Sequence, residues 1–139
     1  MILRTINAER RSHYIVDGDG DSTYGPLPPK ALPRGARDFW FRYGLGTTER
    51  AVVAYEGGVL VGFFRYTVTK TARWARYLIA GGTWVAAKMR RRRIALGMWE
   101  RAIEKSRPQI VDVCTVSRGG EKLVKRLRTL HPTIRWEDC

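Results

Sequence analysis

Four consecutive arginines, Arg90 to Arg93, are the residues of this 139-residue chain with the most specific chemistry. They follow an apolar segment that ends at Val85, and a helical pattern begins at or just before Ile94. A helix N-terminus presents unpaired N–H groups and the positive end of the helix dipole, so anions bind there. Guanidinium groups add bidentate donors for phosphate. The segment therefore predicts a phosphate or pyrophosphate site, with a nucleic-acid patch or a nuclear-localisation tract as the competing interpretation.

Few other side chains are suited to acid–base or metal chemistry. Asp112, on an expected strand, is a candidate general base, although a surface or hydrogen-bonded carboxylate fits the same pattern. The two histidines and two cysteines are scattered, which predicts neither a zinc site nor a disulfide framework. We interpret Cys114 as a small buried side chain, His131 as a loop residue and His13 as a residue without an identifiable partner.

A long segment rich in proline and glycine separates the first residues from the rest of the chain. Residues 17–35 hold four of the six prolines and four glycines, which predicts a loop or an extended arm. Its start alternates aspartate and glycine as a calcium loop does. However, Ser22 stands where such a loop needs glycine, and Pro28 where it needs a bidentate glutamate. We expect a solvated turn here and no metal.

Apolar periodicity predicts the elements that position these residues. The expected strands are Met1–Ile6, Ala51–Tyr55, Val59–Val68, Tyr77–Val85, Ile110–Val116 and Thr133–Trp136. Glu56-Gly57-Gly58 joins two of them as a hairpin turn, because glycine adopts positive φ readily. Gly81-Gly82 indicates a bulge or a close approach of two backbones.

Helical spacing appears in the second half of the chain. One helix is expected from Ile94 to just before Pro108, and a second one after Gly120, with Leu123, Leu127 and Leu130 as its apolar stripe. Weaker patterns favour short helices over residues 8–16 and 37–43. The order of the elements predicts an α/β fold with a mixed sheet. Its N-terminal part would be antiparallel, and its C-terminal strand–helix–strand part would be parallel.

Composition and charge limit the classes of protein to which the chain can belong. A mass of 15.9 kDa and a hydrophobic content of 44% fit one globular domain over residues 1–139.

The net charge is +13, and residues 70–139 alone carry 17 basic and six acidic side chains. This imbalance predicts an anionic partner: nucleic acid, an acidic protein or a phosphate-bearing cofactor. Without a signal-like or membrane-length apolar run, we expect a soluble cytoplasmic protein and no membrane partner.

The arginine segment resembles the acetyl-CoA loop of the GNAT N-acetyltransferase superfamily. That loop follows a strand and opens a helix with the pattern Q/R-x-x-G-x-G/A, and Arg90-x-x-Arg93-Ile94-Ala95 keeps the spacing. Val85 and Met89 fit its hydrophobic positions. The hairpin AVVAYEGGVLVGFFRYTV, with Gly62 at the customary glycine, and the segment IVDVCTVSRGGEKLVKRL are similar to further family motifs. The resemblance covers about residues 50–130 and implies a GNAT-like mixed sheet in a divergent member.

The resemblance also implies a function. Acetyl-CoA would be the co-substrate, and a primary amine of an unknown acceptor would receive the acetyl group. Backbone amides from Arg91 to Ala95 would cradle the pyrophosphate, and the strand edge at Trp84–Ala86 would pair with the pantetheine arm. Ser117 stands where a family Asn meets that arm. The implied cofactor-binding residues are Val85, Arg90, Arg91, Arg92, Arg93, Ile94, Ala95 and Ser117.

Three positions depart from the family pattern and leave an alternative open. Arg93 replaces a glycine, and Val124 stands where the family often has a tyrosine that acts as the general acid. The strand before the loop has no carboxylate that could act as the base. The alternative is a non-catalytic GNAT-fold structural or binding protein whose basic half docks on nucleic acid or an acidic protein. Such a protein would suit a phage-encoded or virion-associated assembly component. Trp74 in a basic setting fits nucleobase stacking, whereas no pattern of a sequence-specific DNA reader is present.

Overall fold

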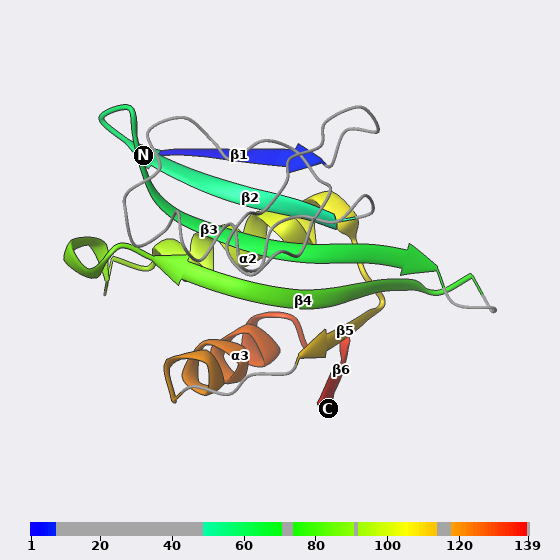
Figure 1. Ribbon diagram of the computed structural model, residues 1–139. Helices are drawn as coiled ribbons and strands as arrows, with labels where there is room; N and C mark the ends of the chain where they lie inside the picture. Colours follow the sequence, from blue (N-terminus) through cyan, green and yellow to red (C-terminus); the bar gives the residue numbers. More distant parts are fainter. Residues whose placement is uncertain (8–48, 71–73, 91, 114–117, 139) are drawn as a thin grey trace, which may run out of the picture.

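The structure is a computed structural model that describes residues 1–7, 49–70, 74–90, 92–113 and 118–138. These residues form a six-stranded sheet, two α-helices and a 3-10 turn (Figure 1). The strands are β1 (Ile2–Asn7), β2 (Glu49–Glu56), β3 (Val59–Lys70), β4 (Arg76–Val85), β5 (Ile110–Val113) and β6 (Arg135–Asp138). The helical elements are η1 (Ala87–Met89), α2 (Ile94–Ser106) and α3 (Arg118–Leu130).

The sheet changes direction in its C-terminal half. Strands β1 to β4 pair antiparallel, whereas β5 pairs parallel with β4 and β6 pairs parallel with β5. The strands lie in sequence order, with α2 connecting β4 to β5 and α3 connecting β5 to β6. The prediction of an α/β mixed sheet with an antiparallel and a parallel part is therefore confirmed.

Glycines produce two local features that the sequence predicted. Gly57 and Gly58 have φ values of +58° and +77°, as the tight turn between β2 and β3 requires. On β4, Gly81 and Gly82 both lie opposite Arg65, because Phe64 pairs with Thr83 and Tyr66 pairs with Ala80. A Cβ atom at Gly81 would lie 2.8 Å from the Arg65 carbonyl oxygen, so this bulge is also a close approach of two backbones.

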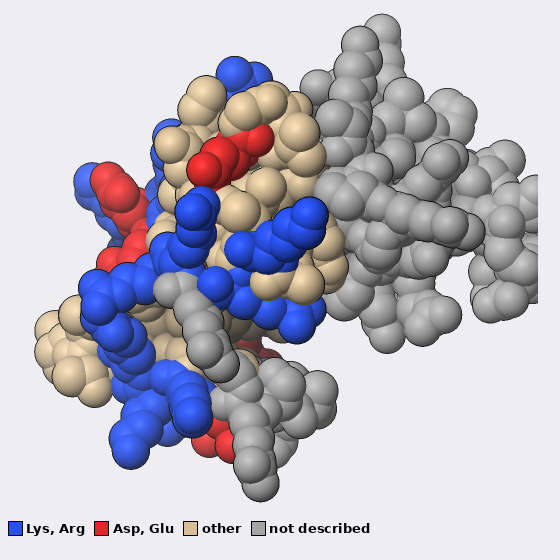
Figure 2. Space-filling model, turned by 90° about the vertical axis from the view of Figure 1, so that its left-hand side faces the viewer, with Lys and Arg blue, Asp and Glu red and all other residues tan. Residues whose placement is uncertain are grey.

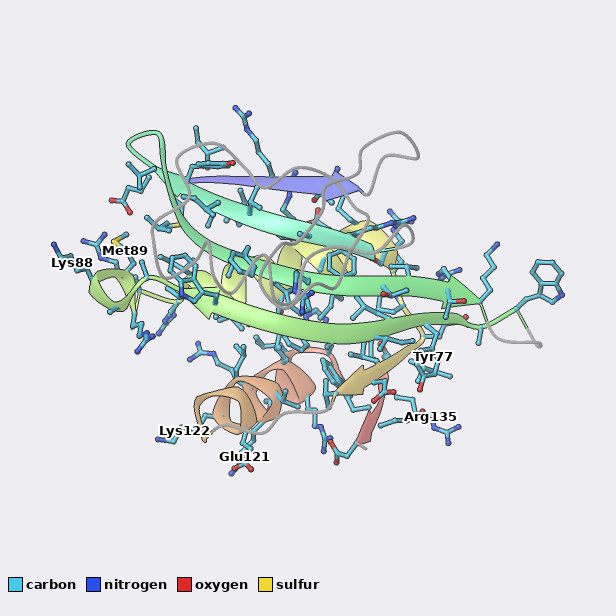
Figure 3. All side chains as sticks on the ribbon, in the orientation of Figure 1. Tyr77, Lys88, Met89, Glu121, Lys122 and Arg135 are labelled. Carbon is cyan, nitrogen blue, oxygen red and sulfur yellow. The ribbon has the colours of Figure 1, made fainter. Side chains whose placement is uncertain are left out.

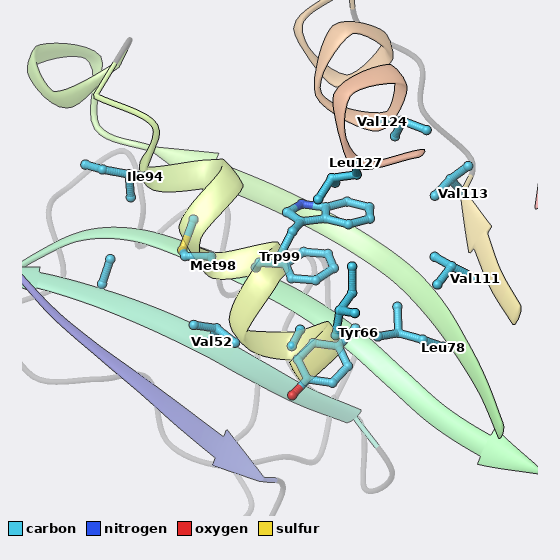
Figure 4. Packing of buried hydrophobic residues seen from close by; sticks show 14 of the residues in the cluster. Val52, Tyr66, Leu78, Ile94, Met98, Trp99, Val111, Val113, Val124 and Leu127 are labelled. Atoms are coloured by element: carbon cyan, nitrogen blue, oxygen red, sulfur yellow. The ribbon is translucent and has the colours of Figure 1, made fainter. Parts of the chain in front are cut away.

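A stack of aromatic rings forms the centre of the core between α2 and the sheet (Figure 4). The Trp99 ring lies 4.2 Å from that of Phe64, and the Trp99 indole N–H donates to the Thr83 hydroxyl at 3.0 Å. Helix α3 adds Val124 and Leu127 to the same cluster. Burial of side chains of this size stabilises a fold by about 1.5–3 kcal/mol each, so both helices are fixed to one face of the sheet.

The structure corrects three details of the sequence prediction. Helix α3 begins at Arg118, before the two glycines, and Leu130 is 51% exposed because it is the last residue of the helix. Val124, at 5% exposure, takes the place in the apolar stripe that Leu130 was expected to have. Strand β6 starts at Arg135, two residues later than expected.

Several predictions fall outside the described residues. These are the short helices over 8–16 and 37–43, the loop over 17–35 with its aspartates, and the roles of His13, Arg91, Cys114 and Ser117.

Candidate functional site

The arginine loop lies where β4 ends and α2 begins. The Ala86 N–H donates to the Val61 carbonyl at 2.8 Å, which holds the end of β4 against β3. After η1, Arg93 adopts the left-handed conformation (φ 59°, ψ 25°) directly before the first helical residue, Ile94. A left-handed residue at this point is what glycine usually supplies, so Arg93 keeps the turn although it is not glycine.

The first turn of α2 has backbone donors without an acceptor among the described residues. The first bond within the helix runs from the Gly97 N–H to the Arg93 carbonyl at 3.0 Å. In the described part of the chain, the amides of Ile94, Ala95 and Leu96 donate no hydrogen bond, and no side chain caps the helix. The first turn holds no acidic residue either. The helix start is therefore an electropositive end with donors available to an anion.

A close approach over Gly62 holds this helix end near the sheet. A Cβ atom at Gly62 would lie 3.1 Å from the Trp84 carbonyl oxygen, 3.2 Å from Met98 Cε and 3.3 Å from Ile94 Cγ2. These distances are tighter than ordinary contacts, so only glycine lets the first turns of α2 pack this closely beside the end of β4.

Most of the described cations around the loop form no ion pair with a described residue. Arg92 lies 3.3 Å from the Glu56 carboxylate, and the Arg90 Nε–H donates to the Val85 carbonyl at 3.3 Å. Within the described residues, Lys88 and the exposed Arg93 have no ion pair, and Lys88 points away from the body of the molecule (Figure 3). Exposed ion pairs contribute at most about 1 kcal/mol, so Arg92 can exchange Glu56 for a stronger anion.

One edge of β4 has no strand partner among the described residues along the second half of the strand. Strand β5 pairs only with Tyr77 to Ile79, and Val113 of β5 makes no pair with Ala80. From Ala80 to Val85, this edge has no strand partner among the described residues. Unpaired N–H and C=O groups on a strand edge can hydrogen-bond an extended ligand that carries amides.

Asp112 lies opposite Ile79, in the last residue pair between β4 and β5 among the described residues. Its side chain belongs to the sheet face that also carries Tyr77 and Glu137, and the Tyr77 hydroxyl donates to the Glu137 carboxylate at 2.6 Å. That hydrogen bond, together with desolvation and the Asp112 carboxylate, raises the pKa of Tyr77 to about 12. Asp112 is six strand residues, or roughly 20 Å, from Val85 along β4, so it does not belong to the arginine loop.

Other candidate residues have structural partners or lie in the core. His131 Nε2 lies 2.6 Å from the Glu100 carboxylate and connects the end of α3 to α2. Val124 is buried, and β4 carries no carboxylate, as the sequence indicated. The described residues include no group of three side chains that could hold a metal ion. No helix among them is long and apolar enough to cross a membrane.

Comparison with known proteins identifies the fold. No protein-family model and no curated protein matches the chain. The structure is similar to a ribosomal-protein-alanine N-acetyltransferase from Brucella melitensis biovar Abortus, with a TM-score of 0.54 and 20% identity over 65% of this chain and 70% of that one. It is also similar to a probable acetyltransferase (TM-score 0.53, 18% identity, 68% of each chain). An aminoglycoside acetyltransferase from an uncultured soil metagenomic sample gives a TM-score of 0.51 at 12% identity, over 78% of this chain and 69% of that one.

The chain therefore has the fold of the GNAT acetyltransferases, which confirms the fold that the sequence resemblance implied. At these identities the likeness establishes the architecture. The reaction and its acceptor have to be argued from the residues of this chain.

Proposed function

We propose that this protein is an acetyl-CoA-dependent N-acetyltransferase that acts on a primary amine. The observation that carries the proposal is the start of α2, where the amides of Ile94, Ala95 and Leu96 have no partner in the described structure. A pyrophosphate accepts hydrogen bonds from such amides and is stabilised by the helix dipole. The helix start follows β4, η1 and the arginine loop, in the order that the sequence pattern of the family also has.

The residues around this helix start fit CoA. Arg90, Arg92 and Arg93 would supply charge to its phosphates, and the pyrophosphate would lie on the amides of Ile94 and Ala95. Bound at this point, CoA would extend its pantetheine arm from Val85 back along the free edge of β4. Strand-like hydrogen bonds to the amides of the arm would position it. We keep Arg91 and Ser117 as proposed contacts on the sequence pattern alone.

The proposed reaction needs little chemistry from the protein beyond positioning. CoA supplies an activated thioester; as the acceptor nitrogen bonds to the acetyl carbon, the carbon–sulfur bond breaks. The nitrogen loses a proton, and the thiolate gains one. We propose that Asp112, which pairs with Ile79 where the described pairing of β4 with β5 ends, accepts the proton from the amine. Val124 has no hydroxyl to protonate the thiolate, so water would supply that proton. Orientation of the two reactants would provide most of the acceleration.

One observation favours a second candidate, a GNAT-fold protein that binds CoA or another anion without catalysis. Val124 is buried in the core, and β4 has no carboxylate near the proposed thioester position. Without a proton acceptor and a proton donor, the same cradle would bind and not turn over.

Release of the CoA thiol from acetyl-CoA, measured with a panel of primary amines beside a CoA-binding assay, separates these candidates. We expect amine-dependent release that Asp112→Asn lowers by roughly 10²–10⁴-fold while CoA binding is retained. Asp138→Asn, an exposed aspartate that pairs with Arg128, is the control and should leave the rate unchanged. Binding without release would support the non-catalytic candidate, and the absence of both would refute the acetyltransferase.

A further inference from the structure

Helix α3 has a cationic outer surface that the proposed acetyl transfer does not need. Lys122, Lys125 and Arg126 are exposed, and none forms an ion pair with a described residue. Arg128, by contrast, pairs with Asp138 at 2.9 Å. Glu121 is the one acidic residue of α3. The helix is thus held to the core by its apolar side and presents unneutralised cations on the other.

This surface is at the same end of the molecule as the arginine loop. Lys122 and Lys88 both lie at that end, on α3 and on η1 (Figure 3). Figure 2 looks directly onto this end and shows Lys and Arg side chains spread over it, with few acidic side chains among them. We call the three α3 cations, together with Lys88, Arg90 and Arg93, the cationic end. In the described part of the chain, none of these six has a carboxylate partner.

The spacing of the charges suits a chain of phosphates. Residues separated by three or four positions on a helix have Cβ atoms about 5–6 Å apart, so Lys122 lies beside both Lys125 and Arg126. The phosphates of a single CoA would be held by the start of α2. The α3 cations belong to a different helix and would remain free for a longer polyanion.

The character of the surface favours nucleic acid over an acidic protein. Protein interfaces depend on a few buried apolar or aromatic anchors. On α3 the only large hydrophobic side chain found exposed is Leu130, at the C-terminal end of the helix. Contacts to a nucleic-acid backbone come mainly from Lys and Arg and need no such anchors.

We propose that the cationic end binds the phosphate backbone of nucleic acid, without reading its bases. The proposal does not require acetyl transfer, and it can be tested without CoA. Binding should follow the behaviour of counterion release, in which the logarithm of affinity falls linearly with the logarithm of salt concentration.

Fluorescence anisotropy of short labelled DNA and RNA duplexes, repeated over a range of salt concentrations, tests the proposal. The variant Lys122→Gln/Lys125→Gln should weaken binding about tenfold or more at low salt and reduce the salt slope by roughly 0.9 for each lost contact. The control Lys70→Gln/Lys105→Gln removes the same charge from exposed positions outside the cationic end and should change affinity by no more than about twofold. Circular dichroism verifies that both variants are folded.

Three results would overturn the proposal. One is equal weakening by the two double variants, which would indicate diffuse attraction by net charge. Another is the absence of salt-dependent binding by the unmodified protein. The third is equally tight binding of poly-glutamate that the α3 variant also weakens, which would assign the surface to an acidic protein. None of these results bears on thiol release from acetyl-CoA, so the two proposals can fail separately.

Discussion

Arg93 shows that the loop keeps the shape of a glycine-containing turn without the glycine. Its φ of 59° lies in the left-handed region, which costs a side-chain-bearing residue about 1–2 kcal/mol relative to the ordinary helical region. The protein thus retains strain at the point where the proposed phosphate site begins. Retention of a strained conformation fits a position whose backbone direction matters to a ligand.

Arg93→Gly should therefore increase the free energy of unfolding by roughly 0.5–1 kcal/mol, because glycine relieves this strain and loses only part of the gain to chain entropy. Urea unfolding monitored by tryptophan fluorescence measures the change. Arg90→Gly removes the same charge from a residue in the extended region (φ −64°, ψ 155°) and should lower stability. Equal destabilisation by both substitutions would contradict the left-handed assignment.

Tyr77 provides a prediction about pH. Hydrogen bonding to Glu137 raises the pKa of Tyr77 to about 12 from 10.0, so folding favours the neutral phenol. The resulting stabilisation is fully present below about pH 10 and is lost as the pH rises through about 12. Burial also raises the pKa of Tyr55 and of Tyr66, so a tyrosinate absorbance titration should show one late-titrating group fewer in Tyr77→Phe than in the unmodified protein.

Glu137→Gln removes the carboxylate that carries most of this effect, so Tyr77 should titrate nearer to 10.0 in that variant. If the titration curve of Glu137→Gln matched that of the unmodified protein, the hydrogen bond between Tyr77 and Glu137 would not be the cause.

At the scale of elements, the position of α2 depends on the absence of a side chain on β3. The Trp84 carbonyl, Met98 and Ile94 would crowd a Cβ atom at Gly62. Gly62→Ala should therefore lower the free energy of unfolding by about 1–2 kcal/mol and also weaken CoA binding, because α2 has to move away from β4.

Gly97→Ala is the matched control within α2. A Cβ atom there would lie 3.6 Å from Leu3 Cδ1, an ordinary van der Waals contact. Alanine in the helix should raise the free energy of unfolding by about 0.5–1 kcal/mol. Thermal and urea unfolding of both variants measure the contrast. If Gly62→Ala proved neutral, the close packing of α2 would not be what positions the helix start.

The sequence was sufficient to predict the elements whose cause is local. Gly57 and Gly58 predicted the hairpin turn because positive φ is a property of glycine itself. The run ending at Arg93 predicted a helix start, which the structure has at Ile94. That this helix start binds an anion stays a prediction. The period of the apolar residues predicted that the helix starts at or just before Ile94, and α2 begins at Ile94.

Features that depend on strand register could not be read in this way. Asp112, Tyr77 and Glu137 come from three strands, and only the parallel pairing of β4, β5 and β6 brings them onto one face. Val124 replaced Leu130 in the apolar stripe because the end of a helix has no core beneath it, and periodicity alone does not locate that end.

For the molecule as a whole, the edge of β4 without a described strand partner runs toward the same end as the cationic start of α2. Among the described residues, the pairing between the antiparallel and parallel halves of the sheet ends at Ile79, and the start of α2 with its cations follows the end of β4. The charge of +13 strengthens this end for any anion and raises the rate of encounter with it. An anion bound only by net charge would be released by salt, whereas one held by backbone amides would be released less readily.

The most direct test of the central claim is calorimetric titration of acetyl-CoA into the protein and into Ala95→Glu. A glutamate in the first turn of α2 favours the helix by its interaction with the dipole but places charge and bulk where the pyrophosphate would lie. We predict binding to the unmodified protein, no binding to Ala95→Glu, and unchanged binding to Thr69→Glu, which introduces the same charge at an exposed position on β3. If acetyl-CoA bound Ala95→Glu as tightly as the unmodified protein, or bound neither, the start of α2 would not be a CoA site.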